Sequence, residues 1–322
     1  MKIRKNSCLA TMALTVLAAA VFLWPDDARA QRSGAGLDGL FQKSRVTVAV
    51  TDSGLGGLSV MAEAARRMKD SGIFERVEFL FFNALFKSGS GYNSLKTREE
   101  KIRVFDSALA CLEEKYRPDI ILIGCNTLSV LYEDTPFSQK TKTPVIGIVD
   151  TGVELISAGL RQYPEASVII FGTPTTISEG TYARELEKQR FAPERIHSQS
   201  CPELESFIER DHLGDETGML VAGYVGEALQ NIEKSGRPLP RLIISLNCTH
   251  YGYAMPLWEK AFEEEGVKPL EILNPNSRMT DPLFEKRYAG RYKKTAVSAR
   301  VVSMVGISPA KIESLGKWLQ NL

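Results

Sequence analysis

Two cysteines stand just after apolar segments that have the composition of buried β-strands. Cys125 follows residues 120–123 and Cys248 follows residues 242–246, with short polar residues after each thiol. A cysteine can serve as a thiolate base or a thiol acid, because its unperturbed pKa of about 8.5 is lowered by a nearby cation or donor. A helix N-terminus after the strand would favour the thiolate as well. Two such groups on opposite sides of one carbon could remove a proton from one face and return a proton to the other, which inverts that carbon.

Each cysteine has a candidate helper. Asp52 follows another strand and could orient or relay a proton near Cys125, and His250 lies two residues after Cys248. Ionisable groups this close would titrate together. Structural roles compete with these roles: a free cysteine is often a core residue, His250 could be a hydrogen-bonded structural histidine, and Asp52 could cap the helix that begins near Leu58 or close a turn. Two cysteines in matched settings favour the catalytic interpretation.

A glycine-rich turn, residues 52–57, follows the first strand. Glycines at a strand–helix turn can cradle a phosphate, but the turn has neither the G-x-G-x-x-G spacing nor a Walker lysine–serine pair. The alternative is a tight turn that presents backbone N–H groups to a carboxylate. No metal-binding pattern is evident, and the isolated His197 and His212 are expected on the surface. Side chains that could bind the polar ends of an amino acid are Asn126, Thr127, Thr173 and Thr249.

The elements that must position these residues alternate between strand and helix. Helical spacing covers residues 58–68 and 102–116, and strand-like apolar runs cover 46–50, 77–82, 120–123, 144–149, 167–171, 242–246 and 301–305. This alternation predicts an α/β fold with doubly wound parallel sheets. Ligands gather at the carboxyl ends of such strands, where the polar clusters at Asp52, Cys125, Gly172 and Cys248 lie.

The chain also contains two short segments of similar sequence. Residues 118–127 and 240–250 both run from a proline through an apolar strand to a cysteine and a threonine. Two similar domains that close on one ligand would explain this similarity. Chance similarity between two buried strands would explain it as well.

Composition excludes some classes of protein. The chain has 322 residues, of which 43% are hydrophobic and 25% charged, and its formal net charge is +1. This is the composition of a globular enzyme, and the charge indicates no nucleic-acid partner.

The first thirty residues have the pattern of a secretory signal peptide. Lys2, Arg4 and Lys5 precede an apolar run over residues 9–24, and Ala28 and Ala30 form a cleavage site before Gln31. The run is shorter than the ~20 residues of a spanning helix, so we expect cleavage after Ala30 and a periplasmic or secreted chain with no membrane segment. Residues 31–44 are expected to be a flexible N-terminus.

If the chain is exported, its remaining cysteines could form disulfides. These are Cys111, Cys125, Cys201 and Cys248. An even count in an oxidising compartment points to disulfides. The spacings are not those of a small stapled scaffold, so we expect at least two free thiols.

The motifs resemble those of the glutamate racemases, within the aspartate/glutamate racemase superfamily. The matching segments, in family order, are residues 52–58, 125–127, 172–176 and 248–251, with Tyr182 and the Cys201–Pro202 pair also fitting. The resemblance runs from about Val46 to the C-terminus. It implies two α/β domains with the active site in the cleft between them, the first domain comprising residues 45–149 and 258–322 and the second residues 150–257.

The resemblance also implies site residues. It makes Cys125 and Cys248 the acid/base pair of a cofactor-independent isomerase that interconverts L- and D-glutamate or aspartate, with no metal. Asp52, His250 and Glu209 would assist the thiols. Substrate would be held by Asp52, Ser53, Tyr92, Asn93, Asn126, Thr127, Thr173, Cys248, Thr249 and His250.

Some residues depart from the family pattern. Asn93 replaces the glycine of a substrate-binding proline–tyrosine–glycine segment, Asn83 and Ala84 stand where an aspartate–threonine pair is common, and Gly252 replaces a proline. A signal peptide is also unusual, since racemases that supply D-amino acids for cell-wall synthesis work in the cytoplasm. We expect an amino acid as ligand and leave a homodimer open.

Two alternatives to the racemase stay open. One is an exported, non-catalytic amino-acid binding protein on the same scaffold, favoured by the altered residues 86–94 and the signal peptide. The other is a sister chemistry such as decarboxylation or cis–trans isomerisation, which does not need matched thiols.

Overall fold

The structure is a computed structural model that describes residues 37–87, 91–234, 236 and 238–319. The expected signal peptide, residues 1–30, lies outside the described residues. Residues 37–44 were expected to be flexible, yet residues 37–41 are helical and both Leu40 and Phe41 are buried. Phe41 stacks on Phe74 and Tyr288, with ring centroids 5.8 and 4.7 Å away. The aromatic contacts give this segment a fixed place in the core.

The first sheet has five parallel strands in the order β4-β3-β1-β2-β9. Alternate residues of β1 point to opposite faces: Val48 packs in the same cluster as Met61 and Met68 of α2, whereas Ala49 packs in the cluster that contains Leu109 of α3. The sheet is therefore covered on both faces, which is the doubly wound arrangement. Its elements are β1 (Arg45–Asp52), α2 (Leu58–Ser71), β2 (Arg76–Asn83), α3 (Arg98–Tyr116), β3 (Ile120–Ile123), β4 (Val145–Gly147) and β9 (Ala296–Ser303).

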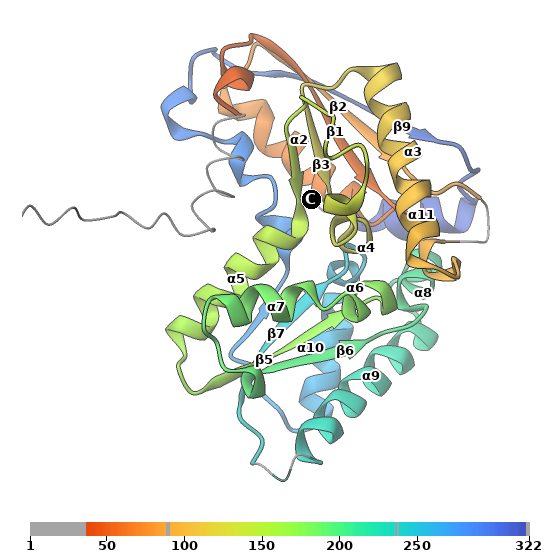
Figure 1. Cartoon of the computed structure of the whole chain (residues 1–322), viewed down its shortest axis with the longest axis vertical. Coiled ribbons are helices and arrows are strands. Elements are labelled where there is room, and N and C mark those ends of the chain that lie inside the picture. Colours follow the sequence, from red (N-terminus) through yellow and green to blue (C-terminus); the bar gives the residue numbers. More distant parts are fainter. Residues whose placement is uncertain (1–36, 88–90, 235, 237, 320–322) are drawn as a thin grey trace, which may run out of the picture.

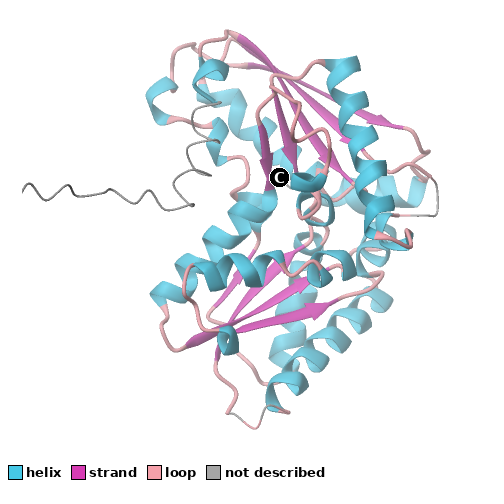
Figure 2. Ribbon diagram, viewed as in Figure 1, coloured by secondary structure: helices cyan, strands magenta, loops and turns pink. Residues whose placement is uncertain are grey.

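The second sheet has four parallel strands in the order β6-β5-β7-β8. One face packs on α5 and α7 and the other on α9 and α10, as Figure 2 shows. The predicted fold class, two doubly wound parallel-sheet units, is confirmed. The elements are α5 (Ile148–Gln162), β5 (Ala166–Gly172), α7 (Thr181–Lys188), β6 (Ile196–Ser200), α9 (Asp215–Glu233), β7 (Arg241–Asn247), α10 (Met255–Glu264) and β8 (Glu271–Leu273).

The second unit extends further along the chain than the expected domain boundary at Leu257. The chain was expected to return to the first domain after Leu257, but β8 pairs with β7 in the second sheet, with Ile244 opposite Ile272. The chain therefore crosses back only after Leu273. The short β6 and β8 were not predicted, and the strand expected over residues 144–149 ends at Gly147, where α5 begins.

The carboxyl ends of the two sheets face one another (Figure 1). Between them lie short helices, two 3₁₀ turns and a C-terminal helix. These are α4 (Asn126–Ser129), α6 (Pro174–Ser178), α8 (Leu204–Arg210), the 3₁₀ turns η1 (Tyr92–Ser94) and η4 (Tyr251–Ala254), and α11 (Pro309–Leu319). Parallel strands place the residues that follow them at one edge, so the predicted polar clusters converge on the space between the sheets.

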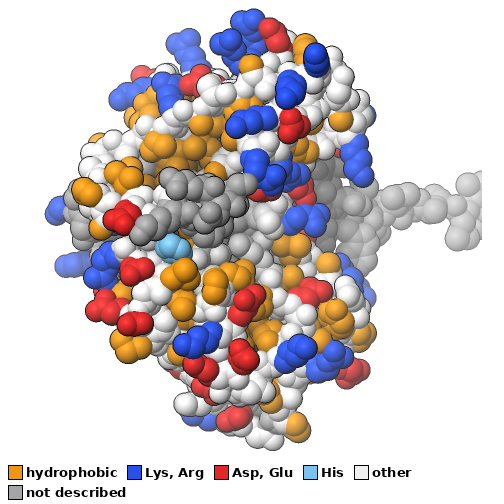
Figure 3. Space-filling view, turned by 180° about the vertical axis from the view of Figure 1, so that it is seen from behind, with side chains coloured by type: hydrophobic (Ala, Val, Ile, Leu, Met, Phe, Trp, Pro, Cys, Tyr) orange, Lys and Arg blue, Asp and Glu red, His pale blue; other side chains and the backbone are white. Residues whose placement is uncertain are grey.

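The surface carries charges of both signs. Figure 3 shows acidic and basic side chains mixed over the lower part of the rear face, with basic ones more frequent above. Within the described residues, no helix is both long and apolar enough to cross a membrane.

Trp258→Ala should strongly destabilise the second unit. Trp258 is fully buried on α10 and packs on Phe171 and Tyr251, with ring centroids 4.8 and 5.5 Å away. Removing an indole from such a core costs about 3–5 kcal/mol. Urea denaturation measures this change in the free energy of unfolding. Leu213→Ala is the control because Leu213 is 49% exposed, and an equal effect of the two changes would contradict this packing.

Candidate active site

A cavity of about 210 Å³ lies between the carboxyl ends of the two sheets. Every side chain predicted as catalytic or substrate-binding lines it, although their roles stay predictions. The sequence prediction missed Gly54, Leu85, Gly91, Glu205, Ser206 and Lys311, which complete the lining. The predicted residues in the lining are Asp52, Ser53, Tyr92, Asn93, Cys125, Asn126, Thr127, Thr173, Glu209, Cys248, Thr249 and His250.

Cys125 lies on the first-sheet side of the cavity, between β3 and α4. Its Sγ is 3.0 Å from Ser53 Oγ, close enough for a hydrogen bond. Burial raises the pKa of the Cys125 thiol well above its ordinary value and the charge of Asp52 raises it further, while the hydrogen bond with Ser53 acts in the opposite direction. A thiolate formed here would be a strong base.

Cys248 lies on the second-sheet side, after β7. Its Sγ is 3.6 Å from Nδ1 of His250. Burial raises the pKa of the Cys248 thiol and the charge of Glu205 raises it further, whereas a hydrogen bond from the His250 backbone lowers it. The two thiols therefore sit in matched, buried settings on opposite sheets.

His250 forms a buried ion pair with Glu209. Nε2 of His250 lies 2.8 Å from Oε1 of Glu209, which also accepts a hydrogen bond from the Leu55 backbone at 2.9 Å. Burial works to raise the pKa of Glu209, but the hydrogen bonds from His250 and Lys311 outweigh it and lower the pKa to about 2. Burial alone would lower the pKa of His250, and the Glu209 carboxylate instead raises it. A protonated imidazole beside Cys248 favours the thiolate.

Asp52 ties the glycine-rich turn to the second sheet. Its Oδ2 accepts hydrogen bonds from the Gly57 backbone at 2.6 Å and from Thr249 Oγ1 at 2.8 Å, and its Oδ1 accepts one from the Gly54 backbone at 3.3 Å. A Cβ at Gly56 would stand 2.4 Å from Thr249 Oγ1, so only glycine permits this approach. Backbone donors of the turn are paired with Asp52 and Glu209, which disfavours the phosphate-cradle interpretation. The expected turn role of Asp52 holds alongside its place in the cavity.

A group of amides and hydroxyls forms the polar side of the cavity. Thr127 Oγ1 and Thr173 Oγ1 are 2.8 Å apart and join the ends of β3 and β5. Asn126 accepts a hydrogen bond from Tyr182 through Oδ1, at 2.5 Å, while its Nδ2 is buried and has no hydrogen-bond partner among the described residues. A buried donor without a partner costs about 1–3 kcal/mol, and a ligand carboxylate would satisfy it.

The altered segment around Tyr92 closes one side of the cavity. The Tyr92 hydroxyl donates to the Ala84 carbonyl at 3.1 Å, so it is engaged within the first unit. Asn93 spans the cleft: Oδ1 accepts from Thr175 Oγ1 at 2.7 Å and Nδ2 lies 3.4 Å from Glu205 Oε1. The asparagine that replaces the family glycine thus joins the two units.

The other thiols and histidines lie elsewhere. Cys111, Cys125, Cys201 and Cys248 are all free, which confirms the expectation of at least two free thiols. Cys201 is buried outside the cavity lining. His197 and His212 were expected on the surface and are instead partly buried. No group of three or more metal-binding side chains is assembled among the residues that the structure describes.

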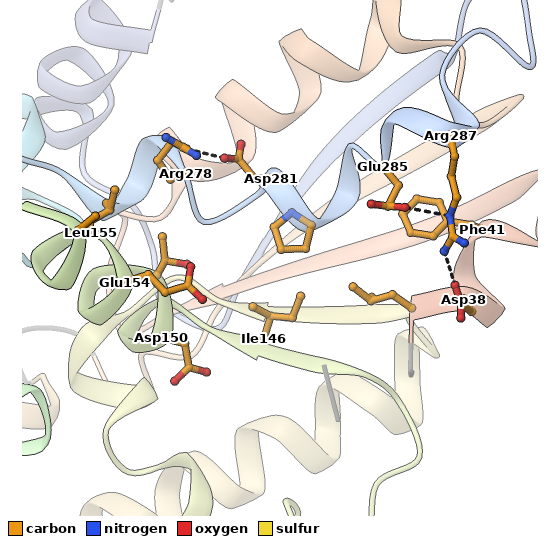
Figure 4. Close-up of a pocket in the computed structure, with 14 residues that line it drawn as sticks. Asp38, Phe41, Ile146, Asp150, Glu154, Leu155, Arg278, Asp281, Glu285 and Arg287 are labelled. Carbon is orange, nitrogen blue, oxygen red and sulfur yellow. Dashed lines mark hydrogen bonds and ion pairs between the residues drawn. The ribbon is translucent and has the colours of Figure 1, made fainter. Parts of the chain in front are cut away.

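A larger cavity, of about 690 Å³, lies apart from the thiols (Figure 4). Its charged groups mostly pair with one another: Arg278 with Asp281, and Arg287 with both Asp38 and Glu285. It contains none of the predicted site residues. The smaller cavity is therefore the candidate active site.

Known proteins of similar sequence are glutamate racemases. No family model matches the chain. The glutamate racemase of Syntrophus aciditrophicus (strain SB) is 29% identical over 241 residues, which cover 74% of this chain and 78% of that protein. The glutamate racemase of Aquifex pyrophilus is 25% identical over 218 residues, covering 67% of this chain and 74% of that protein.

Solved structures share the fold. Glutamate racemase RacE1 from Bacillus anthracis aligns with a TM-score of 0.63 at 21% identity, over 85% of this chain and 94% of that one. The glutamate racemase from Francisella tularensis in complex with D-glutamate aligns with a TM-score of 0.61 at 21% identity, with the same coverage. The likeness of sequence and fold agrees with the motif resemblance. The chain is a homologue of curated glutamate racemases, and this homology supports an isomerase of the racemase type.

Proposed function

We propose that this protein interconverts L- and D-glutamate without a cofactor, by proton transfer at the α-carbon between Cys125 and Cys248. The observation that carries the proposal is the position of the two free thiols, which line one small cavity from opposite sheets. Curated relatives that match most of this chain are glutamate racemases, and one solved neighbour holds D-glutamate.

In the proposed reaction one cysteine starts as thiolate and the other as thiol. The thiolate takes the α-proton, the C–H electron pair stays on the carbon next to the carboxylate, and the other thiol gives its proton to the opposite face. The product leaves the two cysteines with exchanged protonation states, so the reverse reaction uses the same groups. The raised pKa of both thiols makes each thiolate a stronger base toward a weakly acidic C–H.

Polar groups around the thiols fit the two ends of an amino acid. Asp52 and Thr249 would hold the ammonium, since Asp52 is a buried carboxylate. Asn126, Thr127 and Thr173 would hold the α-carboxylate through the Asn126 amide and one hydroxyl of the threonine pair, since the other hydroxyl proton is used in the bond between the two threonines. Asn126 Nδ2, which has no partner among the described residues, is the donor that such a carboxylate would satisfy.

Glu205 is the residue that bears on the substrate side chain. It lines the cavity, and its Oε2 is buried without a hydrogen-bond partner in the described part of the chain. Burial raises the pKa of Glu205. A second carboxylate, such as that of glutamate, is accommodated beside it only if Glu205 is protonated, so a panel of side chains must be assayed together with glutamate.

The test is α-proton exchange in deuterated water. Mature, reduced protein is incubated with each enantiomer of glutamate, aspartate, glutamine and a wider panel, and deuterium at the α-carbon and enantiomer ratios are measured. We expect glutamate to exchange and racemise without added pyridoxal phosphate. Tight binding of one enantiomer with no exchange would instead identify a binding protein, and no exchange across the panel would contradict racemase activity.

A further inference from the structure

The C-terminal helix reaches the cavity through a single lysine. Lys311, in the first turn of α11, donates a hydrogen bond from Nζ to Glu209 Oε2 at 2.5 Å and lines the same cavity as Cys248. The helix is held against α8 by Ser314, whose hydroxyl donates to the Ile208 carbonyl at 3.3 Å. Lys311 is 34% exposed and Glu209 is 8% exposed, so the carboxylate end of this ion pair is shielded from solvent.

Both oxygens of Glu209 are occupied in this arrangement. Oε1 accepts from His250 and from the Leu55 backbone, and Oε2 accepts from Lys311. A buried carboxylate with all its contacts made is held in one orientation, and loss of one contact leaves a buried charge partly unpaired. Without Lys311, the Glu209 carboxylate would rotate more freely. The His250 ring, which Glu209 holds beside Cys248, would then be placed less firmly.

Lys311 also adds a positive charge to the cavity that Cys248 lines. The groups that act on the Cys248 thiol include Asp52, Glu205 and Cys125, each of which disfavours a thiolate there. Glu209 neutralises the charge of His250. Among the residues that line the cavity, Lys311 and His250 are the cationic ones, so Lys311 supplies the positive charge that is left over after Glu209 and His250 are paired.

We propose that Lys311 is a positioning residue, through which α11 fixes Glu209 and His250 beside Cys248 and makes the C-terminal helix part of the active site. The expected effect of Lys311 on the rate of racemisation rests on the proposed racemase function. Its expected effect on the protonation of the Cys248 thiol does not, because that can be measured in the free protein without turnover.

The experiment compares Lys311→Met and Lys311→Arg with Lys260→Met, a control at an exposed lysine of α10. The first readout is the pH dependence of alkylation at Cys248, followed on its peptide by mass spectrometry. The second is the pH profile of glutamate racemisation. Lys311→Met should move the alkylation profile to higher pH by about one unit, the scale of one nearby charge, and lower kcat about tenfold with KM little changed. Lys311→Arg, which keeps the positive charge, should show the wild-type alkylation profile and the wild-type kcat.

The outcomes separate the two proposals. Equal alkylation profiles for Lys311→Met and Lys260→Met would overturn the positioning role. A shifted profile in a protein that never exchanges α-protons would keep the positioning role and reject the racemase function. Thermal unfolding monitors folding of each variant, and Lys311→Gln replaces the methionine variant if that one does not fold.

Discussion

Replacing Cys125 or Cys248 by serine is expected to abolish glutamate racemisation, with a loss of about 10³-fold or more in kcat. Serine keeps the size of cysteine, and Cys125→Ser also keeps the hydrogen bond with Ser53. A serine hydroxyl is not ionised near neutral pH, so it can neither start as the base nor readily deliver the proton to a carbanion. The defect should therefore be chemical, with the fold and substrate binding retained.

The two variants should differ in which enantiomer still exchanges. Each variant keeps one thiol, which can remove and return a proton on its own face only. Deuterium incorporation into L- and D-glutamate, measured separately, should persist in opposite enantiomers for Cys125→Ser and Cys248→Ser. Cys111→Ser is the matched control, because Cys111 is partly exposed on α3 and does not line the cavity. Exchange of both enantiomers in either active-site variant would refute the two-base mechanism.

Glu209→Gln is expected to lower racemisation by about 10²-fold and to act on the Cys248 face. A neutral amide no longer stabilises a protonated His250, because the carboxylate that raises the pKa of that imidazole is gone. Proton removal by Cys248 should suffer more than proton removal by Cys125. Separate exchange rates for the two enantiomers measure this asymmetry, and Glu259→Gln, at an exposed position of α10, serves as control.

The same change should alter stability in acid. Folding lowers the pKa of Glu209 from an ordinary 4.5 to about 2. A group with a lowered pKa stabilises the fold above its unfolded pKa, and this contribution is lost as pH falls from about 4.5 to about 2. Over this pH range the wild-type chain should lose up to about 3 kcal/mol of its free energy of unfolding through this group. Glu209→Gln should not show that part of the loss of stability in acid. Urea denaturation at several pH values measures this change. If the free energy of unfolding falls equally with acid in the wild type and in Glu209→Gln, the ion pair contributes nothing.

The core strands and their polar ends were predictable because both depend on local chemistry. Apolar β-branched runs such as residues 120–123 form strands wherever they can be buried, and all four of them are fully buried. Parallel strands bring the residues after their carboxyl ends to one edge of a sheet, so Asp52 and Cys125 could be expected together, whereas the motif resemblance placed Cys248 across the cleft from them. Whether both cysteines act on one carbon, and whether residues 1–30 direct export, stay predictions.

Other elements had no local signal. β6 is Ile-His-Ser-Gln-Ser, which is too polar to indicate a strand, and β8 has three residues. Both exist because a central strand offers them backbone partners: β5 pairs with β6, and β7 with β8. Tertiary pairing overrides local preference in such edge strands.

The sequence by itself determined the alternating α/β architecture, the two matched thiols and most of the polar residues that line the cavity. The tertiary structure decided how these residues are coupled. The contact between Glu209 and Lys311 joins residues 102 positions apart, and Asn93 meets Glu205 across 112 positions. Periodicity and motif spacing describe neighbours along the chain, whereas charge pairing of this kind depends on how two sheets and a C-terminal helix pack around one cavity.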